Sequence, residues 1–205
     1  MARSFRKKEA QCYHSPMRTF LKFLAVIGLI AITVVIYIFW SSFSSIAAAE
    51  TGIDGRLNAL ITFYADLDGQ YVTPLKSIPD LTADTQSSLD EIHTILVPLA
   101  NPPSGFDARL AILMEAQQKI RQFVTSATLS PALTSTPSFV LLSQESSNLG
   151  KASVLVKEFN TAVGAYNGQL LSKTGNLIGQ WSLRKPKQFL NIDGTFSDST
   201  VVLFN

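Results

Sequence analysis

Residues 139–181 read FVLLSQESSNLGKASVLVKEFNTAVGAYNGQLLSKTGNLIGQW and contain no proline. Apolar residues recur through this stretch at steps of three, four or seven, the spacing of one face of an α-helix. The stripe comprises Phe139, Leu142, Leu149, Val156, Val163, Leu170 and Leu177, flanked by Phe159, Tyr166 and Thr174. The pattern predicts one helix of about 40 residues, roughly 60 Å long. Such a helix needs partner helices along its whole length to bury the stripe.

Three earlier segments carry stripes of the same kind. They are Ile53, Leu57, Leu60, Tyr64, Leu67 and Tyr71; Leu81, Thr85, Leu89, Ile92 and Leu96; and Leu110, Leu113, Ile120 and Val124, where Gln117 interrupts the stripe. Cap-like sequences at Ser77-x-x-Asp80 and Ser104-x-x-Asp107 predict the starts of the second and third helices. The sequence therefore predicts an all-α fold, an antiparallel four-helix bundle with a long last helix, over residues 47–181.

A transmembrane helix is predicted before the bundle, at residues 23–46. Residues 23–40 contain no charge, and 18 residues rise about 27 Å, close to the thickness of the hydrocarbon layer. Tyr37 and Trp40 suit the aromatic belt at one interface, and Arg18 and Lys22 can reach the headgroups at the other. The alternative is a cleaved signal peptide, for which Ala47-x-Ala49 offers a site, but the apolar core exceeds the usual length.

The charges around this span predict its orientation. Residues 1–22 hold six basic residues and one acidic residue, whereas residues 41–60 hold one basic and two acidic residues. Positive charge favours the cytoplasmic side, so we expect a cytoplasmic N-terminus and an extracytoplasmic or lumenal helical domain, on the cell membrane or an internal membrane derived from it. The same basic cluster favours lipid headgroups over nucleic acid. The one cysteine of the chain, Cys12, is either a plain thiol or palmitoylated.

Residues 182–205 form an irregular basic and apolar tail with a β-prone end at residues 201–204. Its position after the last helix returns it toward the bilayer. Two interpretations stay open: the tail, with Arg184, Lys185, Lys187, Phe189 and Leu190, contacts headgroups, or it is solvated and frayed.

Catalytic motifs are not found in this sequence. Asp90-x-x-His93 has the spacing of one half of a dimetal carboxylate site, but no second such motif accompanies it. Asp66 and Asp68 cannot share a helix face, which weakens an acid–base pair. We therefore expect no catalytic residue, no metal site, no cofactor and no enzyme activity.

Asn160 and Asn167 are the unusual polar positions of the last predicted helix. They lie seven residues apart, so they occupy equivalent heptad positions. Either they lie in the apolar seam, where they fix its register or belong to a satisfied buried network, or they lie at its edge and contact water.

The pattern Phe159-Asn160-x-x-Val163-x-x-Tyr166-Asn167 resembles the closing helix of the LemA family, whose aromatic-Asn pair is repeated. The segment Ile78-Pro79-Asp80-Leu81, after Asp66-Leu67-Asp68-Gly69-Gln70, is similar to an earlier motif of that family. The resemblance implies a divergent member with a single span and a helical bundle outside the membrane. This chain departs from the family pattern at Phe159, at Asp80 and at residues 172–175.

The leading interpretation is a membrane-anchored helical scaffold or interaction protein of the cell envelope. Its expected partners are the lipid bilayer and either other proteins or a second copy of the chain. One branch of the family helps to build magnetosome membranes, so the resemblance implies membrane shaping or organelle biogenesis as an alternative. A membrane-anchored metal-dependent enzyme is a third, which would need a ligand cluster that the sequence does not show.

Overall fold

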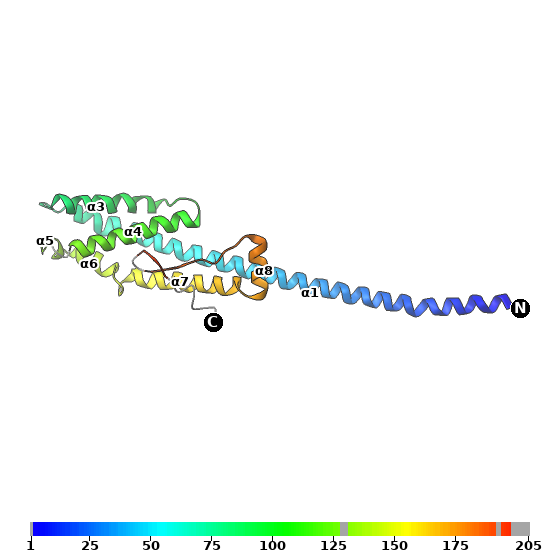
Figure 1. The fold of residues 1–205 in the computed structure, drawn as a ribbon. Coiled ribbons are helices and arrows are strands. Elements are labelled where there is room, and N and C mark those ends of the chain that lie inside the picture. The colour runs from blue at the N-terminus through cyan, green and yellow to red at the C-terminus, as the bar shows by residue number, and fades with distance from the viewer. Residues whose placement is uncertain (1, 128–130, 192–193, 198–205) are drawn as a thin grey trace.

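The computed structural model describes residues 2–127, 131–191 and 194–197, and the prediction of an all-α protein is confirmed (Figure 1). The helices are α1 (Ala2–Leu67), the π-helix η1 (Asp68–Val72), α2 (Thr73–Lys76), α3 (Ala83–Leu96), the 3-10 helix η2 (Val97–Ala100), α4 (Phe106–Ala127), α5 (Pro131–Thr134), α6 (Pro137–Glu145), α7 (Lys151–Leu170) and α8 (Lys173–Ser182). Two short strands, β1 (Phe189–Leu190) and β2 (Phe196–Ser197), pair antiparallel. The predicted β-prone end at residues 201–204 lies outside the described residues.

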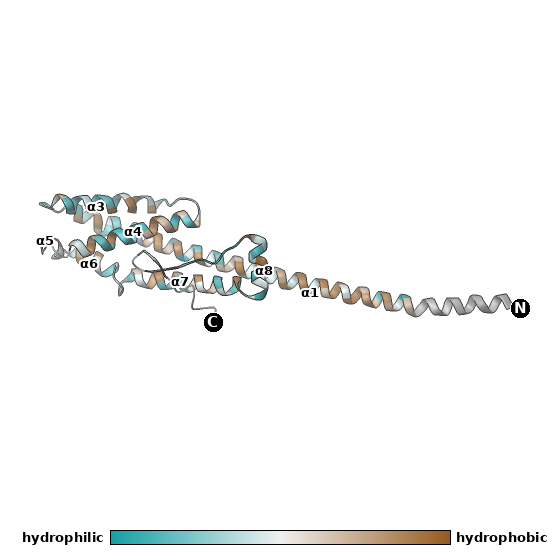
Figure 2. Cartoon of the chain, in the orientation of Figure 1, coloured by the Kyte–Doolittle hydropathy of each residue, from teal (hydrophilic) through white to brown (hydrophobic). Residues whose placement is uncertain are grey.

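The first helix is 66 residues long and has two different halves. Its N-terminal half projects alone from the other helices, and Figure 2 shows that much of this projecting part is hydrophobic. Exposed apolar side chains continue from Met17 to Phe43, and the first buried one is Ile46. The helix is long and apolar enough to cross a membrane, and its most apolar window is not buried inside the protein. A core helix of a soluble domain would be buried there.

The C-terminal half of α1 runs through the helical domain, where α7 packs along it and α4 and α8 also contact it. The predicted heptad seam forms the centre of the core, since Ile53, Leu57, Leu60, Tyr64 and Leu67 are all buried. Helices α3 and α4 pack against each other, and both also contact α1. A single helix therefore joins the projecting apolar segment to the core without a break.

Gly52 and Gly55 lie inside this continuous helix with open space where a side chain would be. Alanine is favoured over glycine in a helix interior by about 1 kcal/mol, so we expect Gly52→Ala and Gly55→Ala each to raise the free energy of unfolding by about that amount. Urea unfolding in detergent measures this. Destabilisation by either change would show that α1 bends where the projecting apolar segment joins the part inside the core.

The prediction of one long last helix is wrong, because residues 139–181 form α6, α7 and α8. The first break follows Ser146 and Ser147, whose hydroxyls donate to the Leu142 and Gln144 carbonyls. Gly150 then caps α7 in an extended conformation, where a Cβ would overlap the Gln144 carbonyl oxygen.

At the second break Ser172 caps α8 by accepting from the Gly175 N–H at 3.1 Å. A Cβ on Gly175 would overlap the Gln169 carbonyl oxygen, so glycine permits the close turn. Because the chain turns at these two places, Leu149 and Leu177 leave the buried stripe and are exposed.

The predicted start of the second helix also needs correction. Helix α3 begins at Ala83, after Thr82 accepts a hydrogen bond from the Thr85 N–H. Ser77 instead ends α2 and donates to the Pro74 carbonyl at 2.7 Å. Asp80 lies between them in the left-handed region, with φ of 62°, which a helix does not contain. The third helix begins at Phe106, two residues after the predicted capping serine.

Gln117, which interrupts the stripe of α4, is only 2% exposed. Its carboxamide lies beside the Tyr64 hydroxyl, but neither its Nε2 nor its Oε1 meets hydrogen-bonding geometry with any described residue. A buried unpaired amide costs about 1–3 kcal/mol.

We therefore expect Gln117→Met to raise the free energy of unfolding by about 1–2 kcal/mol, because an apolar group of similar length removes that cost. Denaturant unfolding checks this, with the exposed neighbour Gln118→Met as the control. A loss of stability would instead mean that the Tyr64–Gln117 contact is a productive hydrogen bond.

Candidate functional site at the base of the helical domain

The base of the helical domain is the region where α1 emerges from the other helices. Helix α8 contacts α1 there and lies across it rather than along it (Figure 1). It is buried through Gly175, Ile178 and Gly179, and the two glycines permit close packing. Its other faces are open, with Leu177 and Trp181 exposed one helical turn apart.

An apolar groove of about 720 Å³ lies between α8 and α1. The lining residues are Val35, Ile36, Phe39, Trp40 and Phe43 of α1, with Ile178, Trp181 and Ser182 of α8. The rings of Phe39 and Trp181 meet edge to face, with centroids 6.4 Å apart. The chain contains two tryptophans, Trp40 and Trp181, and both line this groove.

A charged layer follows directly above the groove. Arg184 Nε lies 3.1 Å from a Glu50 carboxylate oxygen, and the guanidinium carbon is 4.9 Å from the centre of the Phe43 ring. These contacts tie the end of α8 to α1. Burial raises the pKa of the nearby Tyr166, and the Glu50 carboxylate raises it further, while Arg184 acts in the opposite direction.

Residues 184–190, here called the strap, leave α8 and run back along α7 in an extended conformation (Figure 1). Asn167 donates from Nδ2 to the Lys187 carbonyl and accepts at Oδ1 from the Lys187 N–H, both at 2.8 Å. Asn160 makes the same pair of hydrogen bonds with Leu190, again both at 2.8 Å. Each side chain therefore pairs with the strap as a neighbouring β-strand would.

The spacing of the two asparagines explains why this pairing works. Seven helical residues rise about 10.5 Å and return to nearly the same face. Three extended residues, from Lys187 to Leu190, also span about 10 Å. A heptad pair of asparagines on α7 can therefore hold every third residue of an antiparallel extended chain.

Further contacts fix the strap between α7 and α4. The Tyr166 hydroxyl donates to the Lys185 carbonyl at 3.3 Å, and the Phe189 ring packs over Gly164. Lys187 places its ammonium 4.2 Å from the centre of the Phe106 ring of α4. The buried side chain of Leu190 closes the arrangement.

The edge interpretation was wrong for Asn167, and the helix-register interpretation was wrong for both asparagines. Asn167 is buried, at 4% exposed, and Asn160 is half-buried, yet neither fixes the register of a helix pair, because both bind the strap. The frayed-tail interpretation is likewise wrong over residues 184–190. The seven-residue repeat was visible in the sequence, but its extended partner was not.

The other predicted site residues lie in separate places. Arg18, Lys22, Tyr37 and Trp40 are exposed on the projecting half of α1. Phe159, Val163 and Tyr166 are fully buried in α7 beside the strap. Ile78, Pro79, Asp80 and Leu81 lie before α3, at the end of the domain farthest from the N-terminus, so the two family-like motifs do not meet.

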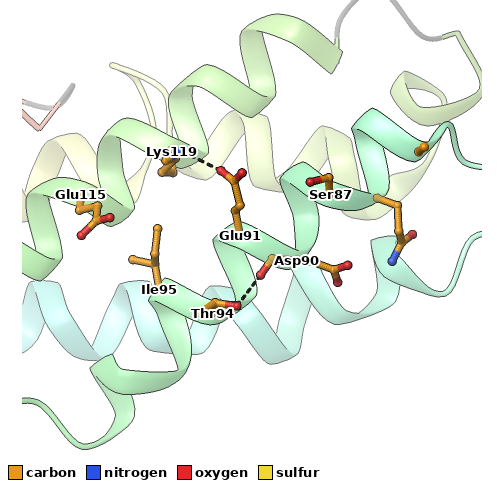
Figure 3. A pocket seen from close by; sticks show the side chains of 9 residues that line it. Ser87, Asp90, Glu91, Thr94, Ile95, Glu115 and Lys119 are labelled. Carbon is orange, nitrogen blue, oxygen red and sulfur yellow. Dashed lines mark hydrogen bonds and ion pairs between the residues drawn. The ribbon is translucent and has the colours of Figure 1, made fainter.

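A second surface, an open groove of about 670 Å³ between α3 and α4, is acidic (Figure 3). Glu91 forms an ion pair with Lys119 at 2.7 Å, and this contact raises the pKa of Lys119. Asp90 pairs with Lys76 at 2.7 Å, and Lys76 is not among the residues labelled in Figure 3.

The predicted half-motif Asp90-x-x-His93 is divided between different partners. His93 places Nδ1 2.8 Å from an Asp68 carboxylate oxygen, whereas Asp90 pairs with Lys76. Within residues 2–127, 131–191 and 194–197, no group of three His, Cys, Asp or Glu residues is close enough to hold a metal ion.

Comparisons of the chain with family models, curated proteins and solved structures found no match.

Proposed function

We propose that this protein is a single-pass membrane protein that carries a helical interaction domain outside the cytoplasm and works by binding rather than by catalysis. The observation that supports it best is the uninterrupted α1, which runs from an exposed apolar segment of membrane-spanning length into the core of the domain. The domain is then an antiparallel four-helix bundle of α1, α3, α4 and the α6–α7 pair. The basic residues before the span favour a cytoplasmic N-terminus.

A rigid connection suits a scaffold. Because α1 enters the core, the domain has a fixed height and tilt relative to the span, unlike a domain on a flexible linker. The acidic groove between α3 and α4 is at a distance from the base and stays open to a partner protein. The resemblance to the LemA family agrees with this organisation and rests on the sequence motifs alone.

Membrane shaping is the second candidate, and the exposed apolar edge of α8 favours it. A helix that inserts beside a span widens one leaflet and changes its curvature. Deformation of vesicles by the reconstituted protein, lost on replacement of Leu177 and Trp181 by serine, would support this candidate over a scaffold without membrane-shaping activity.

The anchor is tested by alkaline carbonate extraction of membranes, followed by mass measurement of the retained protein. We expect the chain to resist extraction and to keep its full mass of 22.4 kDa. Ile30→Arg, which places a charge at the centre of the span, should weaken membrane retention, whereas Thr33→Ser is the matched control. A shorter soluble product beginning after Ala49 would show a cleaved signal peptide and overturn the proposal.

A further inference from the structure

We propose that α8 lies in the plane of the membrane interface, with Leu177 and Trp181 inserted between lipid headgroups and acyl chains. This inference rests on the proposed membrane anchor. It concerns the surface of α8 and not the strap. The strap binds α7, so α8 is the element of the domain nearest the span.

The level of α8 along α1 is the first support. Trp181 contacts Phe39 and shares a groove with Val35, Ile36 and Trp40, all of which belong to the uncharged run of residues 23–40. If those residues lie in the bilayer, Trp181 lies at its boundary. Tryptophan is enriched at that boundary because its ring is apolar and its N–H is polar.

The direction of α8 is the second support. Helix α8 lies across α1 rather than along it, so it lies along the membrane surface when the span is upright (Figure 1). Leu177 and Trp181 share one edge of α8, and the Trp181 contact with Phe39 shows that this edge faces along α1 toward the span. They are 55% and 88% exposed, so the protein itself leaves this apolar edge uncovered.

The polar residues around this edge fit the same position. Asn176 and Gln180 are exposed on a neighbouring face of α8, joined by a hydrogen bond of 3.3 Å. Exposed Lys173 and Lys185 flank the helix, where their ammonium groups can reach phosphates. The partly exposed ion pair of Arg184 with Glu50 begins the polar layer above. An apolar edge between polar flanks is the pattern of an interfacial helix.

The two tryptophans make a direct test possible in the full chain reconstituted in phosphatidylcholine vesicles. Trp40→Phe leaves Trp181 as the reporter, and Trp181→Phe leaves Trp40. We expect Trp181 to show blue-shifted emission, weak quenching by aqueous acrylamide, and stronger quenching by lipids brominated near the headgroup than by lipids brominated near the chain end. Leu177→Lys should reduce the quenching by lipid, and Gln180→Lys, on the polar face, should not.

The outcomes separate the inference from the anchor. If Trp40 is quenched by lipid but Trp181 is quenched only by acrylamide, the anchor stands and the interfacial helix is wrong. If Trp181 is shielded from both quenchers, a protein surface, such as a second copy, covers α8 and the inference is overturned. If lipid quenches neither tryptophan, the anchor itself fails and α8 falls with it.

Discussion

Replacement of Asn160 and Asn167 together by leucine is expected to lower the free energy of unfolding by about 3–5 kcal/mol and to release the strap. Four hydrogen bonds to the backbone of Lys187 and Leu190 are lost, and each is worth about 0.5–1.5 kcal/mol, with a further cost where a buried backbone group is left unpaired. Hydrogen exchange at the Lys187 and Leu190 amides measures strap release, and urea unfolding measures the energy.

The exposed Asn148→Leu is the matched control, and we expect it to change stability by less than about 0.5 kcal/mol. Asn167→Asp tests the donor separately, because the carboxylate can still accept from the Lys187 N–H but can no longer donate to its carbonyl. A rise in stability for the double leucine variant would contradict the strap, since that result is expected of asparagines that only interrupt an apolar helix seam.

Between about pH 10 and pH 12 the domain is expected to lose about 2 kcal/mol of stability through Tyr64 alone. Burial raises the pKa of Tyr64 to about 12 from the ordinary 10.0, with the nearby Gln117 side chain acting in the opposite direction. In this window the unfolded tyrosine releases its proton while the folded one keeps it. The folded state therefore binds more protons, and its stability falls as the pH rises.

Urea unfolding in detergent at about pH 9 and about pH 12, for the wild type and Tyr64→Phe, checks this. Lysine deprotonation affects both proteins, so the difference between them isolates the hydroxyl. We expect the phenylalanine variant to lose less stability by about 2 kcal/mol. Equal losses would show that water reaches the Tyr64 hydroxyl in the folded protein.

Helical periodicity was the part of the fold that the sequence made predictable. Seams such as Ile53–Leu57–Leu60 are buried because three- and four-residue steps place side chains on one face whatever the partner is. Interruptions without proline were harder to find. Gly150 and Gly175 end the long periodic run through close approach to backbone carbonyls, and a close approach depends on tertiary structure rather than on local preference.

The strap was hidden for a related reason. Its hydrogen bonds use the backbone of Lys187 and Leu190. Nearly all residue types carry the same backbone groups, so the sequence does not show where such bonds form. Asn160 and Asn167 were recognisable as a repeated polar pair. Their seven-residue spacing, however, fits a second helix as well as an extended chain, so it did not identify the partner. The change of direction between α7 and α8 likewise depends on the local cap at Ser172, and the spacing of the apolar residues does not reveal this cap.

The orientation of the chain is tested most directly with Cys12, the one cysteine of the sequence. Spheroplasts treated with a membrane-impermeant maleimide should leave Cys12 unlabelled until detergent opens the membrane. In a Cys12→Ser background, Ser87→Cys on the exposed face of α3 should be labelled at once. Immediate labelling of Cys12 together with protection of the cysteine at position 87 would place the helical domain in the cytoplasm and contradict the proposed envelope role.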